Sequence, residues 1–134
     1  MANVLLVEDD SELRKALRLN LEEFGHKVVE AGDGREAMLL FRSVGADIVV
    51  TDLVMPEKEG LETISEFRSH RPELPIVAMS GGGRIAPGLN LSMALRLGAR
   101  RVLLKPFPIS ELDQAVTELT GKGAGGSQGS PRLG

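Results

Sequence analysis

Two hydrophobic patterns alternate along the chain. Short segments rich in apolar residues lie at residues 4–7, 26–31, 47–51, 75–79 and 101–104. Segments of this length and apolar character are typical of strands buried in a sheet. The pattern therefore predicts five strands.

A helical period follows each predicted strand. After the first strand, Leu13, Leu17 and Leu21 recur at the spacing of one helix face, and Gly25 is a typical C-terminal stop. Comparable faces lie within residues 35–44, 61–67, 89–97 and 108–120. Five alternations of strand and helix predict an α/β fold, a doubly wound five-stranded parallel sheet with helices on both faces.

The composition narrows the class of protein. The 134 residues include no cysteine and carry a formal net charge of -3. The chain therefore lacks disulfides, a thiolate nucleophile and Cys-ligated zinc, and no basic run indicates a nucleic-acid surface. No apolar stretch approaches the roughly 18–20 residues of a membrane span. We expect a cytoplasmic protein that contacts neither nucleic acid nor membrane.

Residues 121–134 differ in composition from the rest of the chain. They read GKGAGGSQGSPRLG and offer almost nothing to bury. We expect one domain at residues 1–120, followed at 121–134 by a disordered tail or the start of a linker.

Three adjacent acids, Glu8, Asp9 and Asp10, directly follow the first predicted strand. Like charges this close repel, and their burial is costly unless a cation meets them. Sites in doubly wound sheets lie beyond the carboxyl ends of the strands. That rule selects three further residues: Asp52, Ser80 and Lys105. The acids are either solvated loop residues or parts of a cation site.

An all-oxygen site favours a hard cation. Carboxylates without sulfur or paired histidines suit Mg²⁺, and the strand-end rule brings neither His26 nor His70 to the site. The first strand leads into neither G-x-G-x-x-G nor a Walker lysine, which weakens dinucleotide and flavin interpretations. The GGGR run at residues 81–84 could cradle a phosphate, but we favour a flexible loop.

Four motifs, LLVEDD, TDLVMPEKEG, VAMSG and LGARRVLLKPF, occur in an order that resembles the receiver domain of bacterial two-component response regulators. The resemblance covers residues 1–120 and implies a flavodoxin-like sheet of order 2-1-3-4-5. It also implies that a histidine kinase or phosphotransfer protein supplies a phosphoryl group to one aspartate. The domain would then switch its contacts with a downstream protein.

By this resemblance, Asp52 is the phosphoacceptor and Mg²⁺ is the cofactor. Asp9 would bind the ion directly and Glu8 through water, with Asp52 and the backbone carbonyl of Val54 as further ligands. Asp10 matches a position that is not a ligand, and we expect it to cap the following helix. A carboxylate can attack phosphorus to form an acyl phosphate; the alternative is that Asp52 is a plain turn residue.

The resemblance also gives roles to Lys105 and Ser80. Lys105 would pair with Asp52 and then with a phosphoryl oxygen, to which the Ser80 hydroxyl would also donate. The Lys105–Pro106 peptide is cis in the family. Without the resemblance, Lys105 is a surface lysine and Ser80 a loop serine.

Three features depart from the family pattern. Val102 stands three residues before Lys105, where the family carries Tyr or Phe, so no aromatic ring can rotate there. The spacing from Ser80 to Lys105 is a few residues longer than usual, and we assign the excess to a mobile glycine-rich loop after Ser80. Lys58 replaces a residue that is commonly apolar.

We therefore expect a stand-alone phosphoacceptor that catalyses its own phosphotransfer and dephosphorylation without turning over an independent substrate. Three alternatives stay open. The chain could be a receiver cut from a larger regulator or hybrid kinase, a flavodoxin-like small-molecule binder, or a degenerate receiver that only binds partners.

Overall fold

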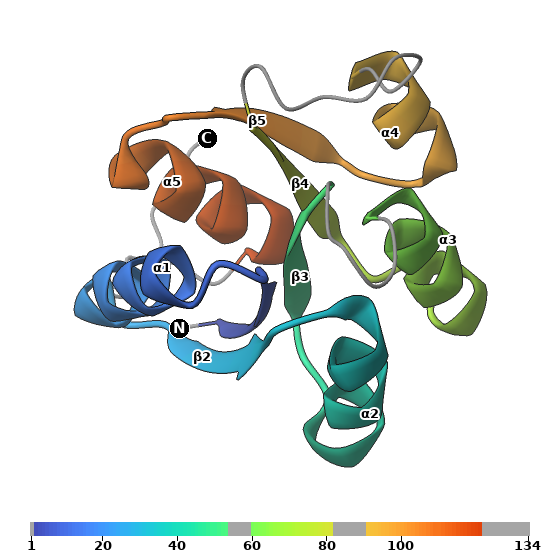
Figure 1. Ribbon diagram of the computed structural model, residues 1–134, viewed down its shortest axis with the longest axis horizontal. Helices are drawn as coiled ribbons and strands as arrows, with labels where there is room; N and C mark the ends of the chain where they lie inside the picture. Colours follow the sequence, from blue (N-terminus) through green and yellow to red (C-terminus); the bar gives the residue numbers. More distant parts are fainter. Residues whose placement is uncertain (1, 54–59, 82–90, 122–134) are drawn as a thin grey trace.

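Strand and helix alternate throughout the fold (Figure 1), as the hydrophobic pattern predicts. The computed structural model describes residues 2–53, 60–81 and 91–121. The strands are β1 (Asn3–Val7), β2 (Lys27–Ala31), β3 (Ile48–Asp52), β4 (Ile76–Gly81) and β5 (Arg101–Lys105). The helices are α1 (Ser11–Glu23), α2 (Gly34–Val44), α3 (Gly60–His70), α4 (Leu91–Leu97) and α5 (Ile109–Thr120).

The strands form one parallel sheet in the order β2-β1-β3-β4-β5. This order confirms the doubly wound, flavodoxin-like topology. Helices α1 and α5 cover one face of the sheet, and α2, α3 and α4 cover the other (Figure 1). The strand order reverses between β1 and β3, and ligands of such folds bind at the carboxyl ends of the strands beside that point.

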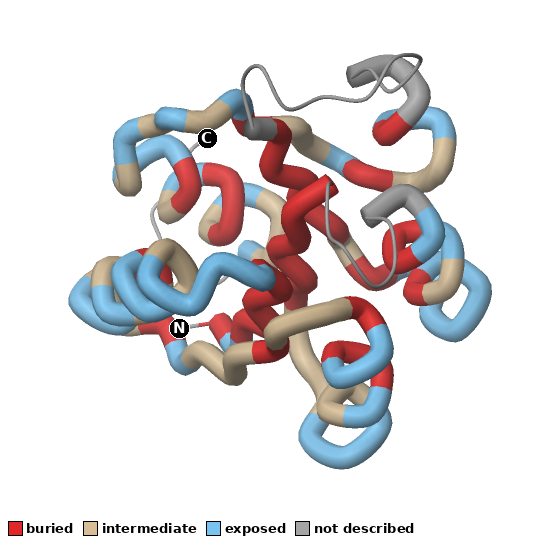
Figure 2. Tube along the Cα trace, in the orientation of Figure 1, coloured by how far each residue is buried: buried red, intermediate tan, exposed pale blue. Residues whose placement is uncertain are grey.

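Each face of the sheet packs its own hydrophobic core (Figure 2). Successive strand residues point to opposite faces. Leu5 and Val49 therefore join Phe67 in the core beneath α2, α3 and α4. Leu6 and Leu112 belong to the core beneath α1 and α5. All five residues of the central strand β3 are buried, so the strand holds its last residue, Asp52, in a fixed place.

Two helices begin at aspartate caps. The Asp10 carboxylate accepts hydrogen bonds from the backbone amides of Glu12 and Leu13, at 3.1 and 3.2 Å, which confirms its predicted role as the cap of α1. Asp33 accepts from the amide of Glu36 at 2.8 Å and caps α2. The cap at Asp33 was not predicted from the sequence.

Three strands extend slightly beyond their predicted ends. Asp52, Ser80 and Lys105 were expected just after their strands, but each lies within one. The parallel ladder pairs Asp52 with Met79 and Gly81 with Lys105. Because backbone amides and carbonyls form this ladder, it continues through polar residues where the hydrophobic pattern has already stopped.

Several predictions fall outside the described residues. They concern Val54, Lys58, the glycine-rich loop at 82–90 and the tail from residue 122. The proposed domain boundary at residue 120 stays a prediction, although α5 ends there. Among the described helices, none has the length and apolar character that crossing a membrane requires.

Candidate functional site

The carboxyl ends of neighbouring parallel strands bring the predicted site residues to one edge of the sheet. Glu8 directly follows β1, Asp52 ends β3 and Lys105 ends β5. These three positions continue the alternation of strand residues that face α1 and α5, such as Leu6 and Leu103. Backbone topology therefore places their side chains on the same side of the sheet.

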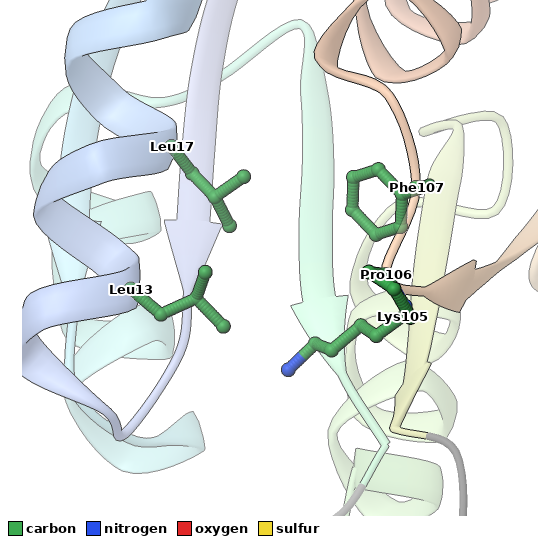
Figure 3. A pocket seen from close by; sticks show the side chains of 5 residues that line it. All are labelled: Leu13, Leu17, Lys105, Pro106 and Phe107. Atoms are coloured by element: carbon green, nitrogen blue, oxygen red, sulfur yellow. The ribbon is translucent and has the colours of Figure 1, made fainter.

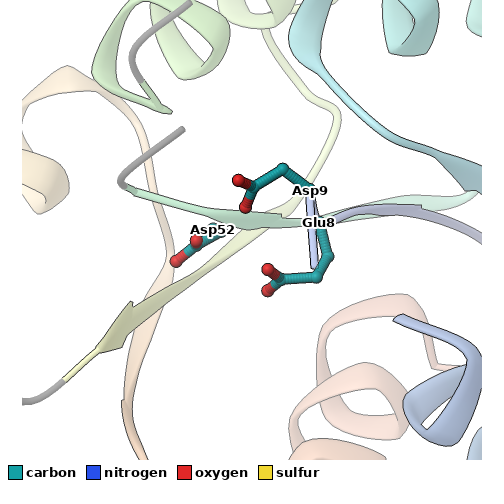
Figure 4. Close-up of side chains that lie close together, drawn as sticks. All are labelled: Glu8, Asp9 and Asp52. Atoms are coloured by element: carbon teal, nitrogen blue, oxygen red, sulfur yellow. The ribbon is translucent and has the colours of Figure 1, made fainter. Parts of the chain in front are cut away.

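Three carboxylates converge at this edge (Figure 4). One oxygen from each of Glu8, Asp9 and Asp52 lies within 4.8 Å of the others. Glu8 and Asp52 are buried, with 2% and 6% of their surface exposed, whereas Asp9 is exposed. The alternative that the three acids after β1 are solvated loop residues does not fit Glu8.

Each carboxylate oxygen of Glu8 accepts a hydrogen bond. Oε1 accepts from Lys105 Nζ at 2.8 Å, and Oε2 accepts from the backbone amide of Asp10 at 3.1 Å. Burial raises the pKa of Glu8 above its ordinary value of 4.5. The Lys105 hydrogen bond opposes this shift, and the negative charge of Asp52 adds to it.

Lys105 lies between two of the acids. Its Nζ is 2.8 Å from Glu8 Oε1 and 3.5 Å from Asp52 Oδ1, and 21% of its side chain is exposed. The sequence predicted the pairing with Asp52, and the structure adds Glu8 as the closer partner. The Lys105–Pro106 peptide bond is cis, as the resemblance implied.

The hydroxyl of Ser80 is buried and has no hydrogen-bond partner in the described part of the chain. Strand alternation places it on the face of Ile76 and Ala78, opposite to that of Met79. A buried hydroxyl without a partner is unfavourable. Ser80 is therefore suited to donate to a group that enters the site.

Arginine and glutamate side chains that the sequence analysis missed support the end of β1. Arg14 Nη1 donates to the backbone carbonyl of Glu8 at 2.7 Å, and Arg14 Nε donates to Glu30 Oε1 at 2.9 Å. Arg18 pairs with the other carboxylate oxygen of Glu30. The available signal was a pair of arginines one helical turn apart on α1.

The two arginines also set the protonation of Glu30. Partial burial acts to raise the pKa of Glu30, but the hydrogen bonds and charges of Arg14 and Arg18 outweigh it. The pKa therefore lies below its ordinary value, and Glu30 is a stable anionic partner for both guanidinium groups.

An apolar pocket of about 490 Å³ opens beside Lys105 (Figure 3). Leu13 and Leu17 of α1 line one side of it, and Lys105, Pro106 and Phe107 line the other. The two walls come from opposite ends of the sequence, so no local motif could indicate the pocket.

The two histidines have contacts away from the acidic cluster. His26 Nε2 lies 2.7 Å from Asp113 Oδ1, and His70 Nε2 lies 3.0 Å from a guanidinium nitrogen of Arg42. Neither histidine belongs to the acidic cluster. Val102, at the position of the family's aromatic residue, is partly buried against the core beneath α2, α3 and α4.

The donor set of the acidic cluster fits a hard divalent cation. Glu8, Asp9 and Asp52 offer only carboxylate oxygens, which Mg²⁺ prefers. Mg²⁺ also retains several waters, so a few protein ligands at an accessible edge are enough. Val54, the predicted carbonyl ligand, lies outside the described residues.

Comparison with known proteins gives a family match over most of the chain. The family described as "Response regulator receiver domain" matches residues 4–117. The chain is 38% identical over 109 residues to the response regulator MprA of Mycolicibacterium vanbaalenii, an alignment that covers 81% of this chain and 46% of that protein. It is 36% identical over 123 residues to the sensor kinase CckA of Brucella abortus, covering 90% of this chain and 13% of that protein.

Solved structures agree with this match. A response regulator receiver domain protein from Clostridium thermocellum superposes with a TM-score of 0.82 at 25% identity, over 90% of this chain and 95% of that chain. The chain spans less than half the length of the first curated relatives it matches, with a largest share of 47%. Family match, sheet order and acidic edge agree, and the chain belongs to the response regulator receiver domains of two-component systems.

Proposed function

We propose that this domain accepts a phosphoryl group on Asp52 in an Mg²⁺-dependent reaction and thereby switches its contacts with a partner protein. The observation that carries the proposal is the convergence of Asp52 with Glu8, Asp9 and Lys105 at one edge of the sheet. A plain turn residue would not require the Asp52 carboxylate to be buried beside two further acids and one lysine. This carboxylate is well suited to receive a group that a cation must accompany.

The proposed transfer makes Asp52 the nucleophile. One carboxylate oxygen of Asp52 attacks the phosphorus of a donor phosphohistidine and forms the acyl phosphate. The phosphorus–nitrogen bond breaks, and the imidazole of the donor retains the electron pair and takes up a proton. Negative charge spreads over the phosphoryl oxygens during this transfer, so the protein acts mainly by positioning and by neutralising charge.

Lys105 and Ser80 would contact the transferred group. The ammonium group of Lys105, 3.5 Å from Asp52, can move from Glu8 to a phosphoryl oxygen. The Ser80 hydroxyl, which lacks a partner among the described residues, can donate to another oxygen. Because both contacts need the phosphoryl group, they can favour one conformation only after transfer.

Glu8, Asp9 and Asp52 would hold the Mg²⁺ ion. Lys105 alone leaves an excess of negative charge among three carboxylates, and that excess would repel a phosphoryl donor. When bound, the ion supplies the missing neutralisation and orients the phosphoryl oxygens.

The proposed donor is a histidine kinase or a phosphotransfer protein, and the proposed target is a downstream protein. The family match supports this setting, since its relatives include a response regulator and a sensor kinase. The apolar pocket between Leu13 and Phe107 opens beside Lys105, whose Nζ is 3.5 Å from Asp52, and offers a donor protein a contact surface there. A stand-alone domain, a piece of a larger regulator and a piece of a hybrid kinase all stay predictions, as does the cytoplasmic location.

Intact mass spectrometry tests the phosphosite. Acetyl phosphate with Mg²⁺ should add one phosphoryl group to the wild type and none to Asp52→Asn. EDTA should abolish the labelling, because transfer onto a carboxylate needs its charge neutralised. Asp10→Asn is the matched control and should still be labelled, since Asp10 caps α1 outside the cluster. Equal labelling of Asp52→Asn and the wild type would overturn the proposal.

A further inference from the structure

The side chain of Arg14 fixes the backbone at the point where the chain leaves β1. Its Nη1 donates to the carbonyl of Glu8 at 2.7 Å, and the amide of Glu8 donates to the carbonyl of Ala31 at 3.0 Å. Both backbone polar groups of Glu8 are therefore bonded. Since the Glu8 carbonyl belongs to the planar peptide unit that leads to Asp9, its direction sets the path of the chain into Asp9.

The guanidinium group of Arg14 is itself held in place. Arg14 Nε donates to Glu30 Oε1 at 2.9 Å, and 21% and 30% of the two side chains are exposed. A Cβ atom at Gly32 would lie 3.4 Å from Arg14 Nη1, an ordinary van der Waals distance, so the guanidinium group lies directly beside Gly32. A guanidinium can serve a carboxylate and a carbonyl together because its donors form a rigid fork.

Asp9 needs such support more than the other two acids do. Glu8 and Asp52 are buried, so surrounding atoms restrict their carboxylates. Asp9 is exposed, so its place depends on the backbone that carries it. Three neighbouring carboxylates repel one another, and a free Glu8–Asp9 peptide unit could turn the Asp9 side chain outward.

From these contacts we infer that Arg14 is a positioning residue for the cation site: it orients the Glu8–Asp9 peptide unit so that the Asp9 carboxylate stays with those of Glu8 and Asp52. Arg14 does not touch the cation. It acts through the carbonyl of Glu8, and Glu30 acts through Arg14. The inference rests on the proposed function, which makes the acidic cluster the Mg²⁺ site.

Arg18 provides the matched control. It lies one turn after Arg14 on α1 and pairs with the same carboxylate, that of Glu30. No hydrogen bond is found between Arg18 and the Glu8 carbonyl in the described part of the chain. A role that depended only on binding Glu30 or on joining α1 to β2 would be shared by both arginines.

The test is an Mg²⁺ titration of the full chain followed by amide NMR signals, for the wild type, Arg14→Met, Arg14→Lys and Arg18→Met. Loss of a group that orients a metal ligand lowers affinity by roughly 10–100-fold. We expect Mg²⁺ binding about tenfold weaker in Arg14→Met, a smaller loss in Arg14→Lys, and a change within about twofold in Arg18→Met. Without metal, the Asp9 amide signal should shift in Arg14→Met and stay in place in Arg18→Met.

Each outcome decides the inference. Binding by Arg14→Met within twofold of the wild type overturns it, as does an equal loss in Arg18→Met. If thermal unfolding shows that Arg14→Met does not fold, Arg14→Lys decides, and wild-type affinity in that variant overturns the inference. A wild type that shows no saturable Mg²⁺ binding removes the proposed function itself, and the inference with it.

Discussion

The surroundings of Glu8 act on its pKa in opposite directions. Burial and the charge of Asp52 disfavour its anionic form, whereas the hydrogen bonds from Lys105 and Asp10 favour it. The net effect raises its pKa above 4.5 in the folded protein, so the neutral carboxyl is relatively better accommodated there than the anion.

Replacing Glu8 with glutamine should stabilise the metal-free protein at neutral pH. A raised pKa in the folded state means that the stability Glu8 contributes is complete below its unfolded pKa. That contribution is lost as the pH rises through the folded pKa. Glu8→Gln should therefore match the wild type near pH 4 and melt at a higher temperature at pH 7, in thermal unfolding with EDTA.

Glu30→Gln is the control of opposite sign. Partial burial acts to raise the pKa of Glu30, but Arg14 and Arg18 lower it overall, so its stabilising contribution exists above the unfolded pKa and disappears in acid. Glu30→Gln should lower the melting temperature at pH 7 and have a smaller effect as the pH falls. A Glu8→Gln variant that is less stable than the wild type at pH 7 would contradict the account of Glu8.

At the residue scale, the sequence predicted which side chains meet, including the pair of Lys105 and Asp52, but not the closer bond from Lys105 to Glu8. The strand-end rule brought Glu8, Asp52 and Lys105 together. It could not show that Lys105 lies nearer to Glu8 than to Asp52, because that depends on the rotamer of a long side chain. The hydrogen bond from Arg14 to the Glu8 carbonyl could not be predicted from the sequence for the same reason.

At the element scale, the residue that follows α4 has no room for a side chain. Gly98 follows α4 with a φ of 134°, a value that L side chains rarely adopt, and a Cβ there would lie 2.7 Å from Arg68 Cδ. Gly45 ends α2 with a φ of 73° and has open space around its missing Cβ. Both glycines have a positive φ, but only at Gly98 would a Cβ also meet a side chain, that of Arg68 in α3.

Gly98→Ala and Gly45→Ala should each lose about 1–3 kcal/mol to backbone conformation, because both glycines have a positive φ. Gly98→Ala should lose more, because its Cβ also meets Arg68. Chemical denaturation followed by far-ultraviolet circular dichroism measures both. Adding Arg68→Ala to Gly98→Ala should recover the part of the loss that comes from the contact. If the two glycine variants lose equal stability, the packing of α4 against Arg68 is not restrictive.

The hydrophobic pattern predicted every strand and helix but not where each strand stops. Apolar runs indicate only the buried part of a strand. The predicted ends of β3, β4 and β5 therefore lie before Asp52, Ser80 and Lys105, which the structure includes in these strands. The hydrophobic pattern also could not predict a contact between side chains that are 87 residues apart in the sequence. His26 binds Asp113 of α5 and accepts from the amide of Ala2, which joins α5 to the start of β1.

Across the whole molecule, the sheet separates the acidic cluster from the Ser80 hydroxyl. Glu8, Asp52 and Lys105 continue the face covered by α1 and α5, while Ser80 continues the face covered by α2, α3 and α4. A group bound to Asp52 that also accepts from Ser80 would join both layers. With Val102 in place of an aromatic ring, this hydroxyl is the described residue best placed to carry the effect of phosphorylation to the second layer. The predicted movement of the loop after Ser80 lies outside the described residues.

Metal binding should stabilise the whole fold, because the acids of the cluster come together only when the ends of β1 and β3 are paired. A ligand that binds only the folded state adds about 2.7 kcal/mol to the free energy of unfolding at a concentration 100 times its dissociation constant. Thermal unfolding of the wild type should therefore shift to higher temperature with MgCl₂, compared with NaCl at equal ionic strength.

Asp9→Ala separates the two effects of charge at this site. Without metal it should melt at or above the wild-type temperature, since removing Asp9 relieves repulsion with Glu8 and Asp52. With MgCl₂ it should lose most of the shift. Glu12→Ala is the matched control, because Glu12 is an exposed acid three residues later that does not belong to the cluster, and it should keep the wild-type response. If Asp9→Ala retains the full shift, the ion binds elsewhere, and the convergence of the three acids needs another explanation.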